Sequence, residues 1–377
     1  MTPPDRWIDR AQVALRNDQT QLLLLLAGTE TAAVPGISAA GATPESRRFT
    51  AAADAELLWA GPARSLPHAL PPLPAGVSPA LISWVAQQQL QLPLLVVDAG
   101  AFVAPAVPHL QLGLPPAACL STGAAMTPRA IERLLQRGRQ LGRGFRRYQP
   151  KGTLVLAECV PGGTSTAEAL LRGLGVEASG VVSGSLRQPP HGLRDGLVRR
   201  GLAAMHARGI SALAPLDVLA ALGDPFQAMA LGVLQGLLLP LDGDAPQALL
   251  AGGSQMLAVA GLFMASLTPV ERSACNDQLA VVTTAWVMQE SGSDLELLAQ
   301  RSAAVWGVHP RLLHSDLRFD SCRQRRYWIT SVVLSKRAWA PAAWPGCVNW
   351  LAAVRKPSPS PVTVSYTHLT LPTTYTV

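Results

Sequence analysis

The sequence predicts an α/β protein with a parallel sheet of about six strands and helices on both faces. Short aliphatic runs bounded by glycine, proline or an acidic residue recur along the 377-residue chain, with helical patterns between them. Continuous apolar strands that alternate with helices are typical of a parallel sheet covered on both faces. Polar residues follow several of these runs, at the strand ends where such sheets bind ligands.

Six runs are predicted as strands, at residues 22–27, 94–97, 153–157, 180–183, 249–251 and 279–285. The stretch 249–267 reaches about the length of a membrane span. It opens with the strand-like LLAGG and lacks flanking Lys or Arg anchors, so a buried strand followed by a helix is favoured. Residues 61–80 are rich in proline and predict a loop. Residues 127–147 predict a basic helix, for which a solvated face is favoured over a polyanion site.

The segment 153–175 (TLVLAECVPGGTSTAEALLRGLG) carries the strongest functional signal. An apolar strand leads to Glu158, and a glycine turn and an Ala- and Leu-rich helix follow. Free N–H groups and the positive end of the helix dipole make such a turn an anion site. The turn and the helix start contain Gly162, Gly163, Thr164, Ser165 and Thr166.

An ordinary helix start is the alternative for this segment, because Ser165 and Glu168 fit a capping box. The segment also lacks the lysine of a Walker loop and the glycine spacing of a dinucleotide-binding motif. On the segment alone, both interpretations stay open.

Polar residues after other strands favour a ligand. They are Thr29, Glu30 and Thr31 after the first strand, Asp98 after the second, Gly184 and Ser185 after the fourth, and Gly252, Gly253, Ser254 and Gln255 after the fifth. One acid alone at such a position most often caps a loop. Several polar groups at successive strand ends instead favour a ligand with phosphate and ribose hydroxyls.

The composition argues against several other classes of protein. The five cysteines have no close spacing, so neither a metal site nor a disulfide framework is expected, and no cofactor is called for. The N-terminus MTPPDRWIDRAQ lacks the apolar core of a signal peptide, and we expect a soluble cytoplasmic protein.

The net charge of +7 comes from residues 323–377, which hold seven basic and no acidic residues; the other 24 basic residues match the 24 acidic ones. Binding to nucleic acid is therefore not expected.

Residues 323–377 differ from the rest of the chain and hold four of its nine tryptophans. If G/C-rich codons are assumed for residues 328–343, the frame beginning one base earlier gives DHERGFVKEGVGAGG, an acidic, glycine-rich string. Residues 363–377 look like translated vector sequence. We interpret the tail as the product of a frameshift within 320–328, ending in vector-derived residues.

Five strings carry a resemblance to a known family. They are LAGTETAAVPGISAAGATPE (26–45), LLVVDAGAFVAPAVPH (94–109), ECVPGGTSTAEALLRGLG (158–175), GDPFQAMALG (223–232) and LLAGGSQMLAV (249–259). The chain resembles, over residues 20–322, the cyanobacterial and archaeal branch of the nicotinate-nucleotide–dimethylbenzimidazole phosphoribosyltransferase superfamily. The resemblance implies an α/β nucleotide-binding domain at 20–290, a small helical domain from 1–19 and 291–322, and a homodimer.

The resemblance also implies a reaction in the assembly of the cobalamin lower ligand. Nicotinate mononucleotide would give its phosphoribosyl group to a benzimidazole-type base, yielding α-ribazole phosphate and nicotinate. Glu158 matches the family's acid and residues 162–166 match its glycine turn, while Asp224 and Gln227 lie in another shared string. The family's general base is the glutamate of a KEG element, which the shifted frame restores. Here Lys336 and Arg337 occupy that region, so we expect this chain to be inactive or nearly so.

Two other interpretations are kept. A non-catalytic nucleotide-binding or regulatory protein of the same fold would bind nicotinate mononucleotide without turnover. A nucleic-acid-binding protein rests only on the charge of the tail. The sequence leaves open which base is accepted, which donor is used and how subunits assemble.

Overall fold

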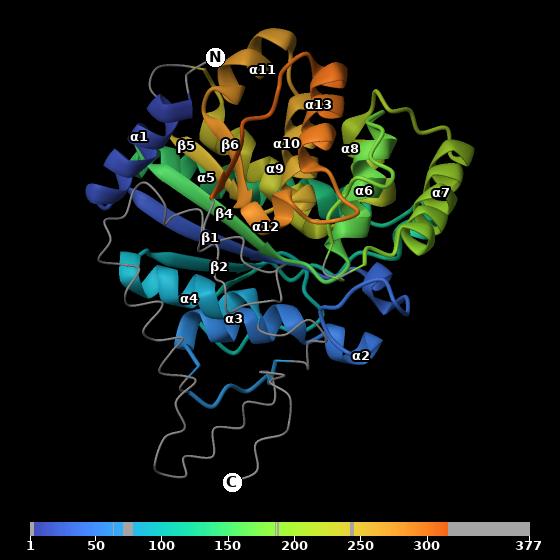
Figure 1. Ribbon diagram of the computed structural model, residues 1–377, viewed down its shortest axis with the longest axis horizontal. Helices are drawn as coiled ribbons and strands as arrows, with labels where there is room; N and C mark the ends of the chain where they lie inside the picture. Colours follow the sequence, from blue (N-terminus) through green and yellow to red (C-terminus); the bar gives the residue numbers. More distant parts are fainter. Residues whose placement is uncertain are drawn as a thin grey trace.

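Seven strands form one sheet in which every pair of neighbours is parallel, in the order β3-β2-β1-β4-β5-β6-β7. This computed structural model describes residues 4–62, 64–70, 78–184, 186, 188–241 and 245–315. The strands are β1 Thr20–Leu26, β2 Leu94–Asp98, β3 Leu110–Gln111, β4 Thr153–Cys159, β5 Gln247–Ala251, β6 Leu279–Thr284 and β7 Leu312–Ser315. Figure 1 shows β1, β2, β4, β5 and β6 side by side. The predicted α/β class with a parallel sheet is confirmed.

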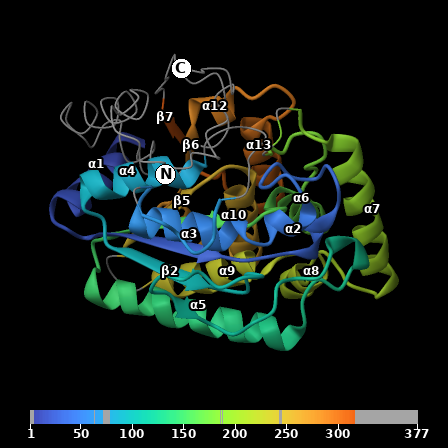
Figure 2. The same cartoon turned by 90° about the horizontal axis from the view of Figure 1, so that it is seen from below.

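Helices cover both faces of the sheet because its strands are apolar on both sides. In β4, Leu154 and Leu156 join one hydrophobic core, whereas Val155 and Ala157 join another on the opposite face. The second core is closed by α1 Pro4–Arg16, α3 Thr50–Ala60 and α4 Pro79–Leu90. The first core is closed by α5 Pro128–Tyr148, α6 Gly163–Gly173, α7 His191–Ala207, α8 Pro215–Leu222, α9 Pro225–Leu238, α10 Ser254–Ala265 and α13 Leu295–Trp306. Figure 2 shows β1 and β2 between α3 on one side and α5 and α9 on the other.

Shorter elements connect these layers. They are η1 Glu30–Ala33, α2 Pro44–Arg47, η2 Leu120–Thr122, α11 Pro269–Asn276 and α12 Ala285–Met288. Residues 249–267 fall in β5 and α10, as predicted. Across the described ranges, no helix combines the length and the apolar character that crossing a membrane requires.

The strand predicted at 180–183 is wrong. Gly180 has a φ of +72°, and the segment has no neighbour in the sheet. Its polar backbone groups are bound outside the sheet instead. The Ser183 N–H donates to Ser254 Oγ at 2.8 Å, Arg194 donates to the Val182 carbonyl at 3.4 Å, and the Asp294 N–H donates to the Val181 carbonyl at 2.9 Å. The backbone groups of this segment are thus bound near the starts of neighbouring helices and not by a neighbouring strand.

The division into two domains stays a prediction. The helix α1, from the expected N-terminal part of the small domain, contacts β1 and β4. The strand β7, from the expected C-terminal part, pairs with β6 in the main sheet. The frameshift interpretation concerns residues that lie outside the described part of the chain.

The helices α5 and α9 pack with their backbones in direct contact. A Cβ built on Gly142 would collide with the Val233 carbonyl oxygen, and one on Gly236 would collide with that of Arg139. Real Cβ atoms do not approach so closely, so this contact requires glycine. Two further glycines at this contact are Gly138 and Gly232.

Candidate active site

The chain changes its direction across the sheet between β1 and β4. From β1 it runs to β2 and β3 on one side, and from β4 to β5, β6 and β7 on the other. In open parallel sheets, ligands bind beyond the carboxyl ends of the strands at such a switch point. Glu158 of β4 lies there, beside Leu25 of β1 in the strand register.

Glu158 is a half-buried acid whose carboxyl group is surrounded by protein, and no described side chain binds it. Burial, together with the nearby carboxylates of Asp224 and Asp54, raises the pKa of Glu158 to about 8. The Val160 N–H acts in the opposite direction. A carboxyl group with a pKa close to neutral pH suits general acid–base chemistry.

Asp54 and Cys159 lie near Glu158 but on the other face of the sheet. Successive strand residues face opposite sides, and Cys159 packs with the core beneath α1 and α3. Its thiol donates to Asp54 of α3 at 3.2 Å, and the Ser78 hydroxyl donates to the same carboxylate at 2.5 Å. Burial raises the pKa of both Asp54 and Cys159. Glu158 therefore lies between carboxyl groups on both sides of β4.

Four of the predicted residues form a buried network on the Glu158 side of the sheet. Asp224 caps α9, where its Oδ1 accepts from the Gln227 N–H at 3.1 Å. Its Oδ2 lies 2.5 Å from the Thr166 hydroxyl and accepts from Gln255 Nε2 at 2.8 Å. Gln227 Nε2 donates to Gln255 Oε1 at 2.9 Å. The network joins the starts of α6, α9 and α10, and its side chains bind one another.

The glycine turn after β4 opens α6 through its backbone. Gly162 occupies the N-cap position with a φ of +85°, which favours glycine. A Cβ on Gly163 would lie 2.9 Å from Gln255 Nε2, so this glycine leaves room for the buried network. The Ser165 hydroxyl is buried without a partner among the described residues, while Thr164 is half-buried.

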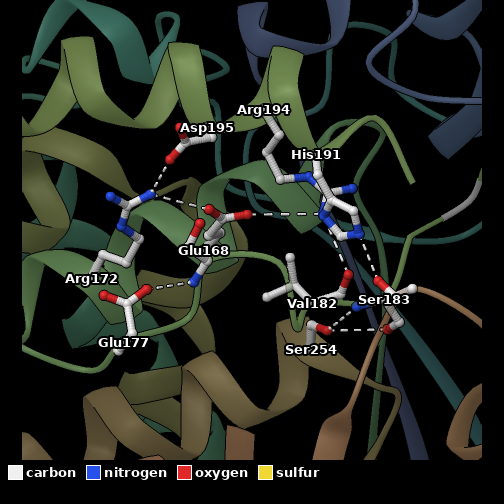
Figure 3. Close-up of polar contacts among 11 residues, drawn as sticks. Glu168, Arg172, Glu177, Val182, Ser183, His191, Arg194, Asp195 and Ser254 are labelled. Carbon is white, nitrogen blue, oxygen red and sulfur yellow. Dashed lines mark hydrogen bonds and ion pairs between the residues drawn. The ribbon is translucent and has the colours of Figure 1, made fainter.

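The alternative capping box of Ser165 and Glu168 does not form. Glu168 is buried inside α6 and faces Arg194 and Arg172 instead (Figure 3). Its carboxylate lies 3.3 Å from Arg172 and 3.8 Å from Arg194, and Arg172 also pairs with Asp195 at 2.7 Å. Burial raises the pKa of Glu168 and the two arginines lower it. These charges join α6 to α7.

A second glycine turn follows β5 and opens α10. Gly253 is the N-cap, and the Ser254 hydroxyl lies 3.1 Å from that of Ser183. A Cβ on Gly184 would lie 2.9 Å from Arg194 Nη2 and 3.8 Å from Thr164 Cγ2. The loop containing Ser183 and Gly184 therefore lies close to both helix starts. Gly252, also predicted as a site residue, directly follows β5 in this turn. Ser185 lies outside the described residues.

The predicted site residues after β1 and β2 form hydrogen bonds with other groups of the protein. The Thr29 hydroxyl accepts from the Thr31 N–H, and the Thr31 hydroxyl accepts from the Leu120 N–H. Asp98 accepts from two backbone N–H groups of the following turn. Glu30 is half-buried and binds Arg48 through both carboxylate oxygens, at 2.9 and 3.0 Å. All four residues thus have partners within the chain, and the side chain of Glu30 is the most accessible to solvent.

Sequence reasoning missed Asp54, Cys159 and Arg194. The two from helices, Asp54 and Arg194, lie far along the chain from Glu158 and belong to no motif. Cys159 could have been found from strand alternation next to Glu158. In the described ranges, no group of three His, Cys, Asp or Glu residues could hold a metal ion.

The fold that these elements define is shared with solved phosphoribosyltransferase structures. CobT from Thermus thermophilus matches with a TM-score of 0.53 and 20% sequence identity, covering 88% of this chain and 89% of that chain. The nicotinate-nucleotide-dimethylbenzimidazole phosphoribosyltransferase from the same organism matches with a TM-score of 0.53 and 21% identity, covering 94% and 95%. At this identity the likeness concerns the fold.

Sequence relatives give the family. The chain is 49% identical over 313 residues to a UPF0284 protein of Prochlorococcus marinus (strain MIT 9313), covering 81% of this chain and 75% of that protein. It is 49% identical over 311 residues to a UPF0284 protein of Parasynechococcus marenigrum (strain WH8102), covering 80% and 75%. The chain belongs to the UPF0284 family. The resemblance to a cyanobacterial branch with this phosphoribosyltransferase fold is confirmed. A scan against protein-family profiles gives no match.

Proposed function

We propose that the parent of this chain transfers a phosphoribosyl group from nicotinate mononucleotide to a benzimidazole-type base. The products are α-ribazole phosphate and nicotinate, in the assembly of the cobalamin lower ligand. The observation that carries the proposal is the position of Glu158 at the β1–β4 switch point, next to two glycine turns that open α6 and α10. The shared fold with the Thermus thermophilus proteins adds support.

Each part of the proposed site has a chemical role. The start of α6 lies next to the phosphate, because the positive end of a helix dipole favours an anion, although the Gly163 and Ser165 N–H groups already donate to the Val160 and Gly162 carbonyls. In its ionised form, which its raised pKa of about 8 places in weakly alkaline solution, Glu158 stabilises the positive charge that develops on the ribose as the bond to nicotinate breaks. The glutamate of the KEG element takes the N–H proton of the base, and this glutamate is absent from the present sequence. Turnover by this chain is therefore expected to be impaired.

An assay of α-ribazole phosphate formation tests the proposal. We expect turnover by the parent protein with the restored reading frame, and a loss of at least about 100-fold in the 377-residue chain, which lacks the general base. Glu158→Gln in the restored protein should likewise lower kcat, with thermal unfolding as the control for folding. Turnover by the 377-residue chain at the parent's rate would refute the impairment.

The second candidate is a non-catalytic nucleotide-binding protein of the same fold. It is favoured by the buried network, in which Asp224, Gln227 and Gln255 bind one another. Saturable binding of nicotinate mononucleotide by the restored protein, with no product formed from any benzimidazole tried, would support it. We further propose that the phosphoribosyltransferase is cytoplasmic and forms a homodimer. Gel filtration of the restored protein tests the dimer.

A further inference from the structure

Four buried polar atoms without a hydrogen-bond partner among the described residues belong to the opposite, amino-terminal side of the sheet. They are Oγ1 of Thr20, Oγ1 of Thr153, Oε1 of Gln247 and Nε1 of Trp7. Their residues are at most 3% exposed. The register places Thr20 beside Thr153, and Thr153 beside Gln247, on neighbouring strands roughly 4.8 Å apart.

The three strand residues face the same side of the sheet. Leu22, Val155 and Leu249, each two positions further along its strand, all pack in the core that contains Trp7. Because alternate strand residues share a face, the side chains of the three strand residues stand in one row beneath α1. Gln247 Nε2 donates to the Trp7 carbonyl at 3.0 Å, which ties the helix to the end of this row.

The four atoms complement one another in hydrogen bonding. The indole Nε1 only donates, the amide Oε1 only accepts, and the two hydroxyls do both. Leaving such atoms unsatisfied in a core is costly, and native proteins commonly satisfy them with buried water that makes about three hydrogen bonds. We propose that the amino-terminal end of the sheet holds an ordered internal water, bound by Thr20, Thr153 and Gln247 and covered by Trp7.

Thr153→Val tests the proposal, because valine has nearly the shape of threonine and lacks the hydroxyl. If the hydroxyl binds water, the variant loses that bond, and we expect the Tm of the full chain to fall by about 2 °C or more. If the hydroxyl is merely unsatisfied, removing it should leave the Tm unchanged or raise it. Thr283→Val is the matched control: Thr283 is a buried, unpartnered threonine of β6 on the opposite face of the sheet. A fall no larger than that of the control overturns the proposal.

Two further measurements separate a shared water from unrelated effects. The double variant Thr20→Val, Thr153→Val should lose less Tm than the two single losses together, since both hydroxyls bind the same water. A crystal structure of the full chain that resolves solvent should show a water within hydrogen-bond distance of Thr153 Oγ1. Direct bonding of the Thr20 and Thr153 hydroxyls to each other, with no water between them, would refute it.

Discussion

Two acidic side chains at the same end of the sheet, Asp224 and Glu158, differ in how their hydrogen bonds are made. Asp224 accepts from Gln255 and from the Gln227 backbone and lies within hydrogen-bond distance of Thr166, whereas no described side chain binds Glu158. A group whose hydrogen bonds are all made inside the protein holds its neighbours in place. Glu158 has only the Val160 N–H as a partner, so its carboxyl group keeps hydrogen-bonding capacity for a ligand. The difference separates a scaffold residue, Asp224, from Glu158, the residue proposed to act on the ligand.

The largest expected effect comes from breaking the scaffold. Asp224→Ala leaves the buried Gln255 amide and the Gln227 N–H without their acceptor, while the Thr166 hydroxyl keeps only the Gly163 carbonyl. We expect a loss of about 3 kcal/mol or more in the free energy of unfolding. Urea unfolding measures it. The matched control is Thr268→Ala at the exposed capping box of α11, which should lose only about 1 kcal/mol. Equal losses in the two variants would show that the Asp224 network is not a scaffold.

A smaller effect is expected where the glycine turn meets the same network. A Cβ at Gly163 would lie 2.9 Å from Gln255 Nε2, so Gly163→Ala must displace that amide from Asp224. We expect a loss of about 1–2 kcal/mol in the free energy of unfolding. Gly144→Ala is the control, because nothing lies within 4 Å of a Cβ at that helix position. If Gly163→Ala is as stable as Gly144→Ala, the turn does not depend on its fit to the network.

The third effect is a change in the slope of stability with pH, and it concerns Glu158, which no described side chain binds. The pKa of Glu158 is about 8 in the folded chain and 4.5 ordinarily. Between these pH values the folded chain keeps a proton that the unfolded chain releases, so stability falls as the pH rises through this window. One such group contributes at most about 1.4 kcal/mol per pH unit. Glu158→Gln should remove this contribution, which urea unfolding between about pH 5 and 9 measures. An unchanged slope would mean that Glu158 ionises normally.

The predicted sheet followed from apolar runs, and its errors have physical reasons. Runs such as 22–27 and 153–157 are buried on both faces, and this makes them continuous in sequence. β3 has only two residues and β7 has four, too few for a pattern to stand out. The run at 180–183 contains two valines but binds residues at helix starts, and this depends on the distant residues Ser254 and Arg194.

The site residues could be predicted from the sequence only where they directly follow an apolar strand. Glu158 and the glycine turn follow an apolar run, so their position at the sheet edge was foreseeable. That Asp224, Gln227 and Gln255 bind one another was not, because the partners are 28 and 31 residues apart along the chain. Asp54 comes from a helix on the other face and carries no local signal.

The glycine contact between α5 and α9 has a mechanical consequence for this edge of the sheet. Because no side-chain layer separates the two backbones, α9 has no room to move toward α5, and a shift along the contact would bring residues with a Cβ to positions where only glycine fits. The start of α9, with Asp224 at its N-cap, is therefore held in a fixed position. Movements that admit or release a ligand should fall to the loops around Ser183 and Glu30, while the Asp224 end of the site stays fixed.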